Sequence, residues 1–247
     1  MRLVGVSFLL ILLCSCAAHR APVPVGEVPL QHQVSQEDEQ YGHEVLNMLT
    51  QDFALDRDDR RINRVRDLVD KLTTAANAGG NPWHVYVLVD DDFKNAAATR
   101  GNYIFVWTGL LRMVSSDGEL ATILAHEIGH LLAGHTQPTP QEEVNELLSG
   151  IAGSIAGQVV AAQGQHPFVA DLAEMLAREL LSAIIVNPGS QRNELEADQI
   201  GIFLMADAGI DPNNAISFWE RARSDPELSG SGLQFLSSHP DSEERLR

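Results

Sequence analysis

His126, Glu127 and His130 form the pattern His-Glu-x-x-His, whose side chains could bind a metal ion and activate a water molecule. The surrounding apolar run, residues 120–133, predicts a helix, and residues four apart lie on one face of a helix. Both imidazoles can therefore point at one metal ion. Glu127 is offset by about a quarter turn, at ~3.6 residues per turn, which places its carboxylate beside the bound water. The spacing predicts a zinc site that can hydrolyse peptide bonds.

The predicted helix carries its own start and stop signals. Ser116-Asp117-Gly118-Glu119 has the form of a capping box, which marks a helix N-terminus. Gly134 suits a helix C-terminus. These signals place the metal-binding pattern in the second half of one short helix.

A catalytic zinc ion needs a third protein ligand and an open position for water. The metzincin spacing would require His at position 136, where Thr136 stands, so that class is excluded. His135 lies nine residues after His126, about half a turn around a continuing helix. We therefore expect His135 to face away from the metal and to be structural or exposed.

A carboxylate on a second helix is the remaining source of the third ligand. Glu194 and Asp198 are four residues apart and share one face of a predicted helix that runs on through Leu204. Either could bind the metal while the other hydrogen-bonds a ligand imidazole. Glu196 lies about 160° from the face of Asp198 and is less suited to either role.

The first residues resemble an export signal of the lipoprotein type. Residues 3–13 form an apolar run of eleven residues, too short to span a bilayer, which needs about 20. Ser15 precedes Cys16 as a small residue precedes the lipidated Cys of bacterial lipoproteins. We expect residues 1–15 to be the signal peptide and Cys16 to be lipidated. The alternative is an ordinary signal peptide cut after Ala18.

This interpretation has consequences for location and for cysteine chemistry. Ala17 follows the Cys where Asp would indicate retention in the inner membrane, so the resemblance points to the periplasmic face of the outer membrane. The mature chain would keep one modified Cys, which leaves no pair for a disulfide. The formal net charge of −17 argues against nucleic acid as a partner.

The rest of the chain divides into a tether and one domain. Residues 16–35 contain three Pro residues and no apolar periodicity, so they predict a lipidated tether. Residues 36–247 predict the domain, with helices at 36–49 and 58–76 and strands at 83–90 and 102–108. A helical insertion occupies about 141–190. We favour a helical hairpin packed on the domain, against a membrane hairpin in residues 147–186, because charged residues in lipid are costly.

These motifs together resemble the family of zinc metallopeptidases that includes the CAAX prenyl protease and HtpX, the gluzincins with Glu as third ligand. The resemblance covers residues 36–246 and is strongest to the soluble, lipid-anchored bacterial members of LoiP and BepA type. It rests on seven matching segments of the sequence: Asn95-Ala96 before a strand, Gly101-Asn102-Tyr103-Ile104-Phe105-Val106, Thr108-Gly109-Leu110-Leu111, His126 to His135, Glu194-Leu195-Glu196-Ala197-Asp198, Ala208-Gly209-Ile210-Asp211-Pro212, and Ser238-His239-Pro240 with Arg245.

The resemblance implies a fold and a role for each matching residue. The fold is α+β and mostly helical: a zincin-like gluzincin core with a small β-sheet and an active-site helix. Three ligands would hold one Zn²⁺ per chain, and a base would activate the water bound to it. A further carboxylate would orient a ligand, and two basic groups would lie near the oxyanion. These are His126, His130 and Glu194 as ligands, Glu127 as base, Asp198 as hydrogen-bond partner of a ligand, and His239 and Arg245 near the oxyanion.

The resemblance also implies a function. We expect a lipid-anchored periplasmic zinc endopeptidase that hydrolyses misfolded or unassembled envelope proteins, with polypeptides as substrates. The strand from Asn102 would hold an extended substrate by strand addition. His239 could instead act as a fourth zinc ligand that displaces the water and silences the enzyme. The alternative function is a chaperone or assembly factor for outer-membrane proteins, in contact with the outer-membrane assembly machinery, whose protease activity is latent.

Overall fold

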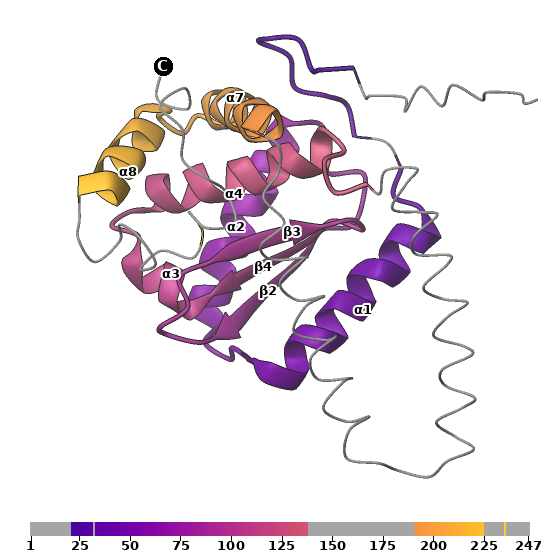
Figure 1. Cartoon of the computed structure of the whole chain (residues 1–247), viewed down its shortest axis with the longest axis vertical. Coiled ribbons are helices and arrows are strands. Elements are labelled where there is room, and N and C mark those ends of the chain that lie inside the picture. The colour runs from indigo at the N-terminus through magenta and orange to yellow at the C-terminus, as the bar shows by residue number, and fades with distance from the viewer. Residues whose placement is uncertain (1–20, 32, 138–190, 225–234, 236–247) are drawn as a thin grey trace, which may run out of the picture.

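A four-stranded sheet with helices on both of its faces forms the framework of the molecule (Figure 1). The computed structural model describes residues 21–31, 33–137, 191–224 and 235. Its elements are α1 (Gln36–Asp52), β1 (Ala54–Leu55), α2 (Asp59–Ala75), β2 (His84–Val89), β3 (Ala96–Thr99), β4 (Tyr103–Trp107), α3 (Thr108–Met113), α4 (Asp117–Leu132), α7 (Gln191–Asp207) and α8 (Asn213–Ser224).

The sheet is mixed, with the strand order β1-β2-β4-β3. β1 and β2 are antiparallel, β2 and β4 are parallel, and β3 and β4 are antiparallel. The two predicted strands correspond to β2 and β4, whereas the short strands β1 and β3 were not predicted. Since β4 pairs on both sides, the expectation that it accepts an added substrate strand is wrong. Among the described strands, β3 forms the edge on that side of the sheet.

Alternating side chains of β4 enter two separate cores. Tyr103, Phe105 and Trp107 pack toward α1, where they meet Val45 and Leu49. Ile104 and Val106 instead belong to the core that α2, α4, α7 and α8 share. A strand covered on both faces is apolar throughout, and every residue of β4 is buried. This central strand therefore fixes the helical layers relative to one another.

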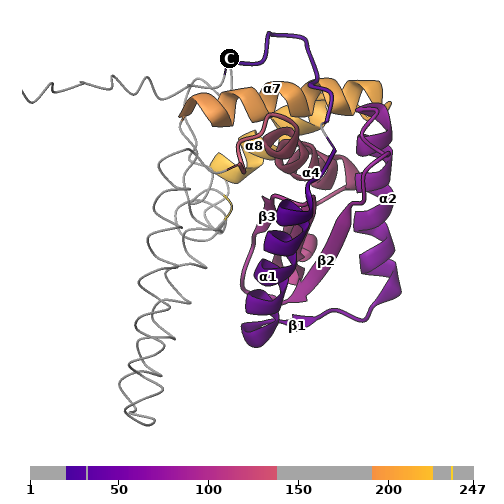
Figure 2. The ribbon, with the colours of Figure 1, turned by 90° about the vertical axis from the view of Figure 1, so that its right-hand side faces the viewer.

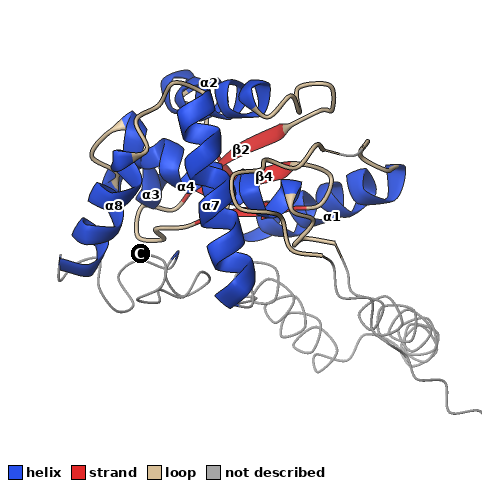
Figure 3. Cartoon of the chain, turned by 90° about the horizontal axis from the view of Figure 1, so that it is seen from above, coloured by secondary structure: helices blue, strands red, loops and turns tan. Residues whose placement is uncertain are grey.

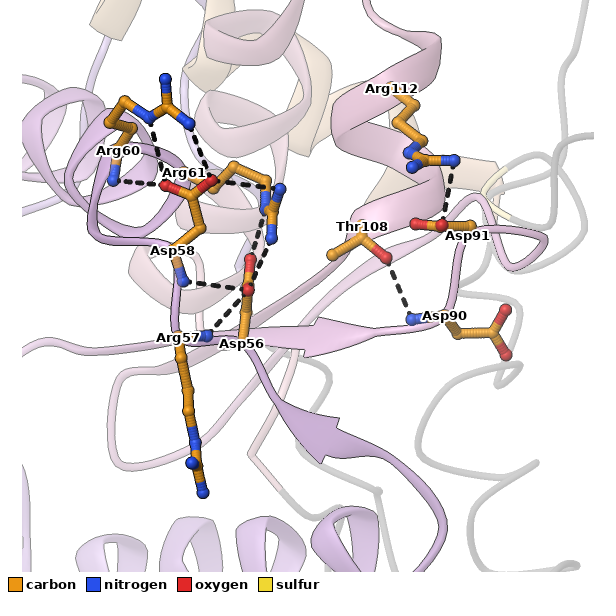
Figure 4. A network of polar contacts seen from close by, with 9 residues as sticks. All are labelled: Asp56, Arg57, Asp58, Arg60, Arg61, Asp90, Asp91, Thr108 and Arg112. Atoms are coloured by element: carbon orange, nitrogen blue, oxygen red, sulfur yellow. Dashed lines mark hydrogen bonds and ion pairs between the residues drawn. The ribbon is translucent and has the colours of Figure 1, made fainter.

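Hydrogen bonds tie the helices to one end of the sheet (Figure 4). Asp56 accepts from Arg61 Nε at 2.5 Å and from the backbone N–H of Asp58 at 3.1 Å, between β1 and the start of α2. The hydrogen bond from Arg61 holds the pKa of Asp56 below its usual value. Directly after β2, the backbone N–H of Asp90 donates to the Thr108 hydroxyl at 3.0 Å. This bond fixes the start of α3 beside the end of β2.

The N-terminus of α4 is fixed by the predicted cap. Ser116 Oγ accepts from the backbone N–H of Glu119 at 3.1 Å, and the Glu119 carboxylate accepts from the backbone N–H of Ser115 at 2.7 Å. Arg221 of α8 also donates to this carboxylate. Burial alone would raise the pKa of Glu119, but the bonds from Arg221 and Ser115 outweigh it and lower that pKa. The cap thus joins α4 to α8 as well as starting the helix.

α7 crosses α4 on the side away from the sheet, at very short range (Figures 1 and 3). A Cβ atom added at Gly129 of α4 would lie 2.7 Å from the carbonyl oxygen of Ala197. A Cβ atom added at Gly201 of α7 would lie 3.1 Å from the carbonyl carbon of Ala125. Glycine at both positions therefore lets the two backbones touch.

Residues 1–20 and 138–190 lie outside the described residues, and so do the predictions for the signal peptide, Cys16 and the helical insertion. Within the described ranges, no helix combines the length and the apolar character that crossing a bilayer requires.

We predict that Gly129→Ala destabilises the protein by about 1–3 kcal/mol, because the added methyl must push α7 away from α4. Alanine is more favourable than glycine in a helix by about 1 kcal/mol. The predicted net loss therefore requires that the steric cost of the close contact exceed this gain. The measurement is the free energy of unfolding in denaturant. Gly79→Ala is the matched control, since nothing lies within 4 Å of a Cβ atom there. Equal effects of the two substitutions would contradict the close crossing.

We predict that Arg221→Met destabilises the protein by about 1–3 kcal/mol at pH 7, because Glu119 loses a charged partner while buried. The folded-state pKa of Glu119 is lowered, so the stability from this pair is present above the ordinary Glu pKa of about 4.3. It is lost as the pH falls through the folded-state pKa. The measurement is the free energy of unfolding in denaturant at pH 7 and at pH 3. The difference between the wild type and the variant should be smaller at pH 3. A difference of the same size at both pH values would exclude this pair as its source.

Candidate metal centre

Three buried side chains from two helices meet at the crossing of α4 and α7. His126 and His130 come from α4, and Glu194 comes from the first turn of α7. Their ligand atoms all lie within 4.8 Å of one another. His126 Nε2 and His130 Nε2 are 3.0 Å apart. Oε2 of Glu194 lies 3.3 Å from His126 Nε2, and the other carboxylate oxygen, Oε1, lies 3.5 Å from His130 Nε2.

This triangle of donor atoms fits a zinc ion. Zinc bonds to His nitrogen and carboxylate oxygen are about 2.0–2.1 Å long, which places neighbouring ligand atoms of a tetrahedral centre ~3.3 Å apart. The three observed distances of 3.0–3.5 Å surround this value. Two imidazoles and one carboxylate are also the donor set of catalytic zinc sites that leave one position for water.

Asp198 fixes the orientation of the first histidine. Its Oδ1 lies 2.8 Å from Nδ1 of His126. When Nδ1 carries the ring proton, it donates a hydrogen bond to the carboxylate. The lone pair of the other nitrogen, Nε2, then points toward Glu194 and His130. The two acidic residues of the shared helix face therefore take different positions. Glu194 enters the triangle of donor atoms, and Asp198 stands behind a ligand.

His135 is buried and structural, which is one of the two expected alternatives, and it is not a member of the group of converging donor residues. Its side chain is only 4% exposed, and its Nδ1 lies 2.9 Å from Nδ1 of His130. The helical angle behind that expectation does not apply, however, because α4 ends at Leu132, and the ring contacts a ligand histidine from behind. Gly134 has φ +72°, and the backbone N–H of His135 donates to the carbonyl of His130 at 2.9 Å.

This hydrogen bond has the pattern of a Schellman motif, in which the chain folds back over the last turn of the helix. The residue after the positive-φ glycine then contacts the residue five positions earlier. Gly134 followed by His135 was therefore a sequence signal for contact with His130.

Glu196 is buried behind His135 and not in the triangle of donor atoms. Its Oε2 lies 2.8 Å from Nε2 of His135, and its Oε1 accepts from the backbone N–H of Val23. The prediction that Glu196 lies off the face of Glu194 agrees with this placement. What the sequence did not indicate is that Glu196 has a buried histidine partner.

Glu127 lies on α4 between the two histidines and is 2% exposed. A carboxylate kept out of bulk water on the helix that carries both histidines is a candidate for a group that accepts a proton. Burial is uncommon for a glutamate and makes Glu127 a candidate for a role at this site.

Phe235 is a site residue that the sequence analysis missed. Its ring is fully buried and stands edge-on to the ring of His126, with the centroids 5.7 Å apart. Its backbone N–H donates to the carbonyl of Lys94, close to the start of β3. No local pattern distinguished this phenylalanine from the others in the chain. His239 and Arg245, predicted near the oxyanion, lie outside the described residues.

Comparison with known proteins agrees with this geometry. The model of peptidase family M48 matches residues 59–247. The mitochondrial metalloendopeptidase OMA1 of Schizosaccharomyces pombe is 34% identical over 165 residues, 67% of this chain and 45% of that protein. OMA1 of Danio rerio is 32% identical over 186 residues, 74% of this chain and 38% of that protein.

The beta-barrel assembly-enhancing protease of Escherichia coli is 28% identical over 176 residues, 71% of this chain and 35% of that protein. The chain thus spans less than half the length of these relatives. The family match extends from the start of α2 to residue 247 and includes the whole group of His126, His130 and Glu194. On this match, which covers well over half of its length, the chain belongs to peptidase family M48.

Proposed function

We propose that this chain is a zinc-dependent metalloendopeptidase that hydrolyses peptide bonds in proteins. The observation that carries the proposal is the convergence of His126, His130 and Glu194 around one point, with Glu127 buried on the same helix. The same proposal accounts for the matches to proteins named metalloendopeptidase. One Zn²⁺ per chain is the metal that this donor set fits.

The residues divide the chemistry between them. His126, His130 and Glu194 hold the metal, which when bound supplies a water of lowered pKa and a positive charge at the scissile carbonyl. Glu127 takes the proton from that water and returns it to the leaving amine nitrogen. Asp198 holds the ring of His126 so that Nε2 stays available to the metal.

The edge strand β3 is the place where we propose that an extended substrate binds. Among the described strands it pairs only with β4, and it packs against α4. A peptide added to this edge would gain backbone hydrogen bonds that do not depend on its sequence. Such binding suits a protease of unfolded segments.

His239 and Arg245 complete the proposal as groups near the developing oxyanion. Phe235, four residues before His239, contacts His126, and four residues of chain span at most ~14 Å. This short connection supports the proposal that His239 can reach the metal. It would either stabilise the oxyanion or occupy the fourth zinc position and block the water.

We further propose that the chain is anchored by a lipid on Cys16 to the periplasmic face of the bacterial outer membrane and degrades misfolded envelope proteins there. The export signal in the sequence supports this location, and so does the match to a beta-barrel assembly-enhancing protease. The matches to mitochondrial proteins support the proposed peptidase activity of the domain. They do not support the proposed bacterial location. The name of that bacterial relative also favours a second candidate function, an assembly factor whose proteolysis is secondary.

We predict that Glu127→Gln abolishes cleavage of casein, with a fall in rate of at least about 100-fold, while one zinc per chain remains. Glutamine keeps the shape of the side chain but cannot accept the proton. The measurement combines a casein cleavage assay, with and without a chelator, and elemental analysis. Near-normal cleavage by the variant would rule out Glu127 as the base. Cleavage by the wild-type protein that survives complete metal removal would rule out the zinc mechanism.

We predict that His239→Ala changes the basal rate of casein cleavage, and that the direction identifies its role. A rise indicates that His239 blocks the water position, whereas a fall indicates that it stabilises the oxyanion. An unchanged rate would remove His239 from the site.

We predict that Cys16→Ser moves the protein from the membrane pellet to the soluble periplasmic fraction, because the apolar run before it is too short to anchor the chain. The measurement is cell fractionation followed by immunoblotting. A variant that stays wholly in the membrane pellet would contradict the lipid anchor.

A further inference from the structure

We propose that His135, Glu196 and the backbone N–H of Val23 form a relay of hydrogen bonds that positions His130 for the metal, so that the N-terminal segment, residues 21–28, is part of the metal centre's support. This inference rests on the proposed zinc function of the site. It assigns a positioning role to three groups that take no part in the proposed chemistry.

The relay begins at the ring of His130 and ends at the N-terminal segment. Nδ1 of His130 lies 2.9 Å from Nδ1 of His135, and Nε2 of His135 lies 2.8 Å from Oε2 of Glu196. The other oxygen of Glu196 accepts from the backbone N–H of Val23. The side chains of His135 and Glu196 are 4% and 6% exposed, so water does not compete freely for these bonds.

Only one arrangement of protons satisfies all of these contacts together with a metal ion. A metal bound at Nε2 of His130 leaves the ring proton on Nδ1, which donates to Nδ1 of His135. The proton of His135 must then be on Nε2, where it donates to Glu196. The carboxylate of Glu196 accepts from two sides, as an ionised group can. The relay therefore fixes both the tautomer and the orientation of His130.

The two ligand histidines are thus oriented by different means. His126 meets a carboxylate directly, at Asp198. His130 is linked to a carboxylate, Glu196, through the ring of His135. Hydrogen-bond partners behind metal ligands contribute about 10–100-fold to metal affinity or activity. We expect contributions of this size from His135 and Glu196, although neither approaches the metal.

The N-terminal segment follows one face of α7, which holds the far end of the relay in place. Val23 donates to Glu196, and the carbonyl of Pro24 accepts from Gln199 Nε2 at 3.2 Å. A Cβ atom added at Gly26 would lie 3.8 Å from Cζ of Phe203. Positions 196, 199 and 203 share one face of a helix. Figure 2 shows this segment passing α7 before the chain reaches α1.

The N-terminal segment packs against the domain, although the sequence analysis assigned it to the tether. Val23 and Val28 are partly buried against the main core. Gln31 Nε2 donates to the side-chain oxygen of Asn102 at 2.6 Å, beside the start of β4. The segment is therefore held against α7 and the main core, and Gln31, which follows it, contacts the start of β4.

The test is zinc affinity, measured on the full-length protein by competition with a chromophoric chelator. His135→Ala and Glu196→Ala should each bind one zinc at saturation but with an affinity about 10–100-fold below that of the wild type. Glu196→Gln should fall between wild type and Glu196→Ala, because the two donors meet different carboxylate oxygens and glutamine replaces one of these oxygens with an NH₂ group, which cannot accept. The visible spectrum of the cobalt-loaded variants should change with the geometry of His130.

A matched pair of substitutions tests the role of the N-terminal segment. Val23→Pro removes the backbone N–H, whereas Val23→Ala keeps it and controls for the lost side chain. Pro22 and Pro24 flank the position, so a further proline suits the local chain. We expect the proline variant to bind zinc at least about threefold more weakly than the alanine variant, since Glu196 loses one of its two donors.

Affinities within twofold of the wild type for His135→Ala, Glu196→Ala and Glu196→Gln would overturn the relay. Equal affinities for the two Val23 variants would remove the N-terminal segment from it. If His135→Ala fails to fold, as judged by circular dichroism, the zinc affinities of Glu196→Gln and of the two Val23 variants still test the relay. Absence of zinc binding by the wild-type protein would instead refute the proposed function itself.

Discussion

The close crossing of α4 and α7 is the constraint on which the rest of the structure depends. Two ligand atoms lie on one helix and the third on another, so the metal site exists only while the two helices keep their distance and angle. The glycines Gly129 and Gly201 allow the backbones to touch. β4, buried on both faces, provides the layer against which α4 packs. The site is therefore a product of tertiary packing and not of the His-Glu-x-x-His pattern alone.

Patterns local in sequence were sufficient to predict the parts of the site that lie on one element. The cap at Ser116 and the spacing of His126 and His130 were readable because helix geometry fixes them within a few residues. The α+β, mostly helical class with a small sheet was also predicted and is found. From the residues alone, Glu194 and Asp198 remained interchangeable; the structure separates them, because only the packing of α7 decides which carboxylate enters the triangle.

The errors and omissions arise where the chain changes direction or where distant segments meet. A helical angle was applied to His135 although the helix ends before it. β3 was missed because Ala96–Thr99 is too short and too uniform in composition to show alternation, and its neighbour β4 was taken as the edge. Phe235 and Val23 reach the site from opposite ends of the sequence, and no local pattern reports such contacts.

The central claim is that α7 supplies the third metal ligand across this crossing. Zinc content of purified Glu194→Ala, measured by elemental analysis beside the wild type, tests it most directly. We expect one zinc per chain in the wild type and almost none in the variant, with circular dichroism showing that the helices remain. A folded variant that still retains one zinc per chain would contradict the account, because the metal would then be held without α7.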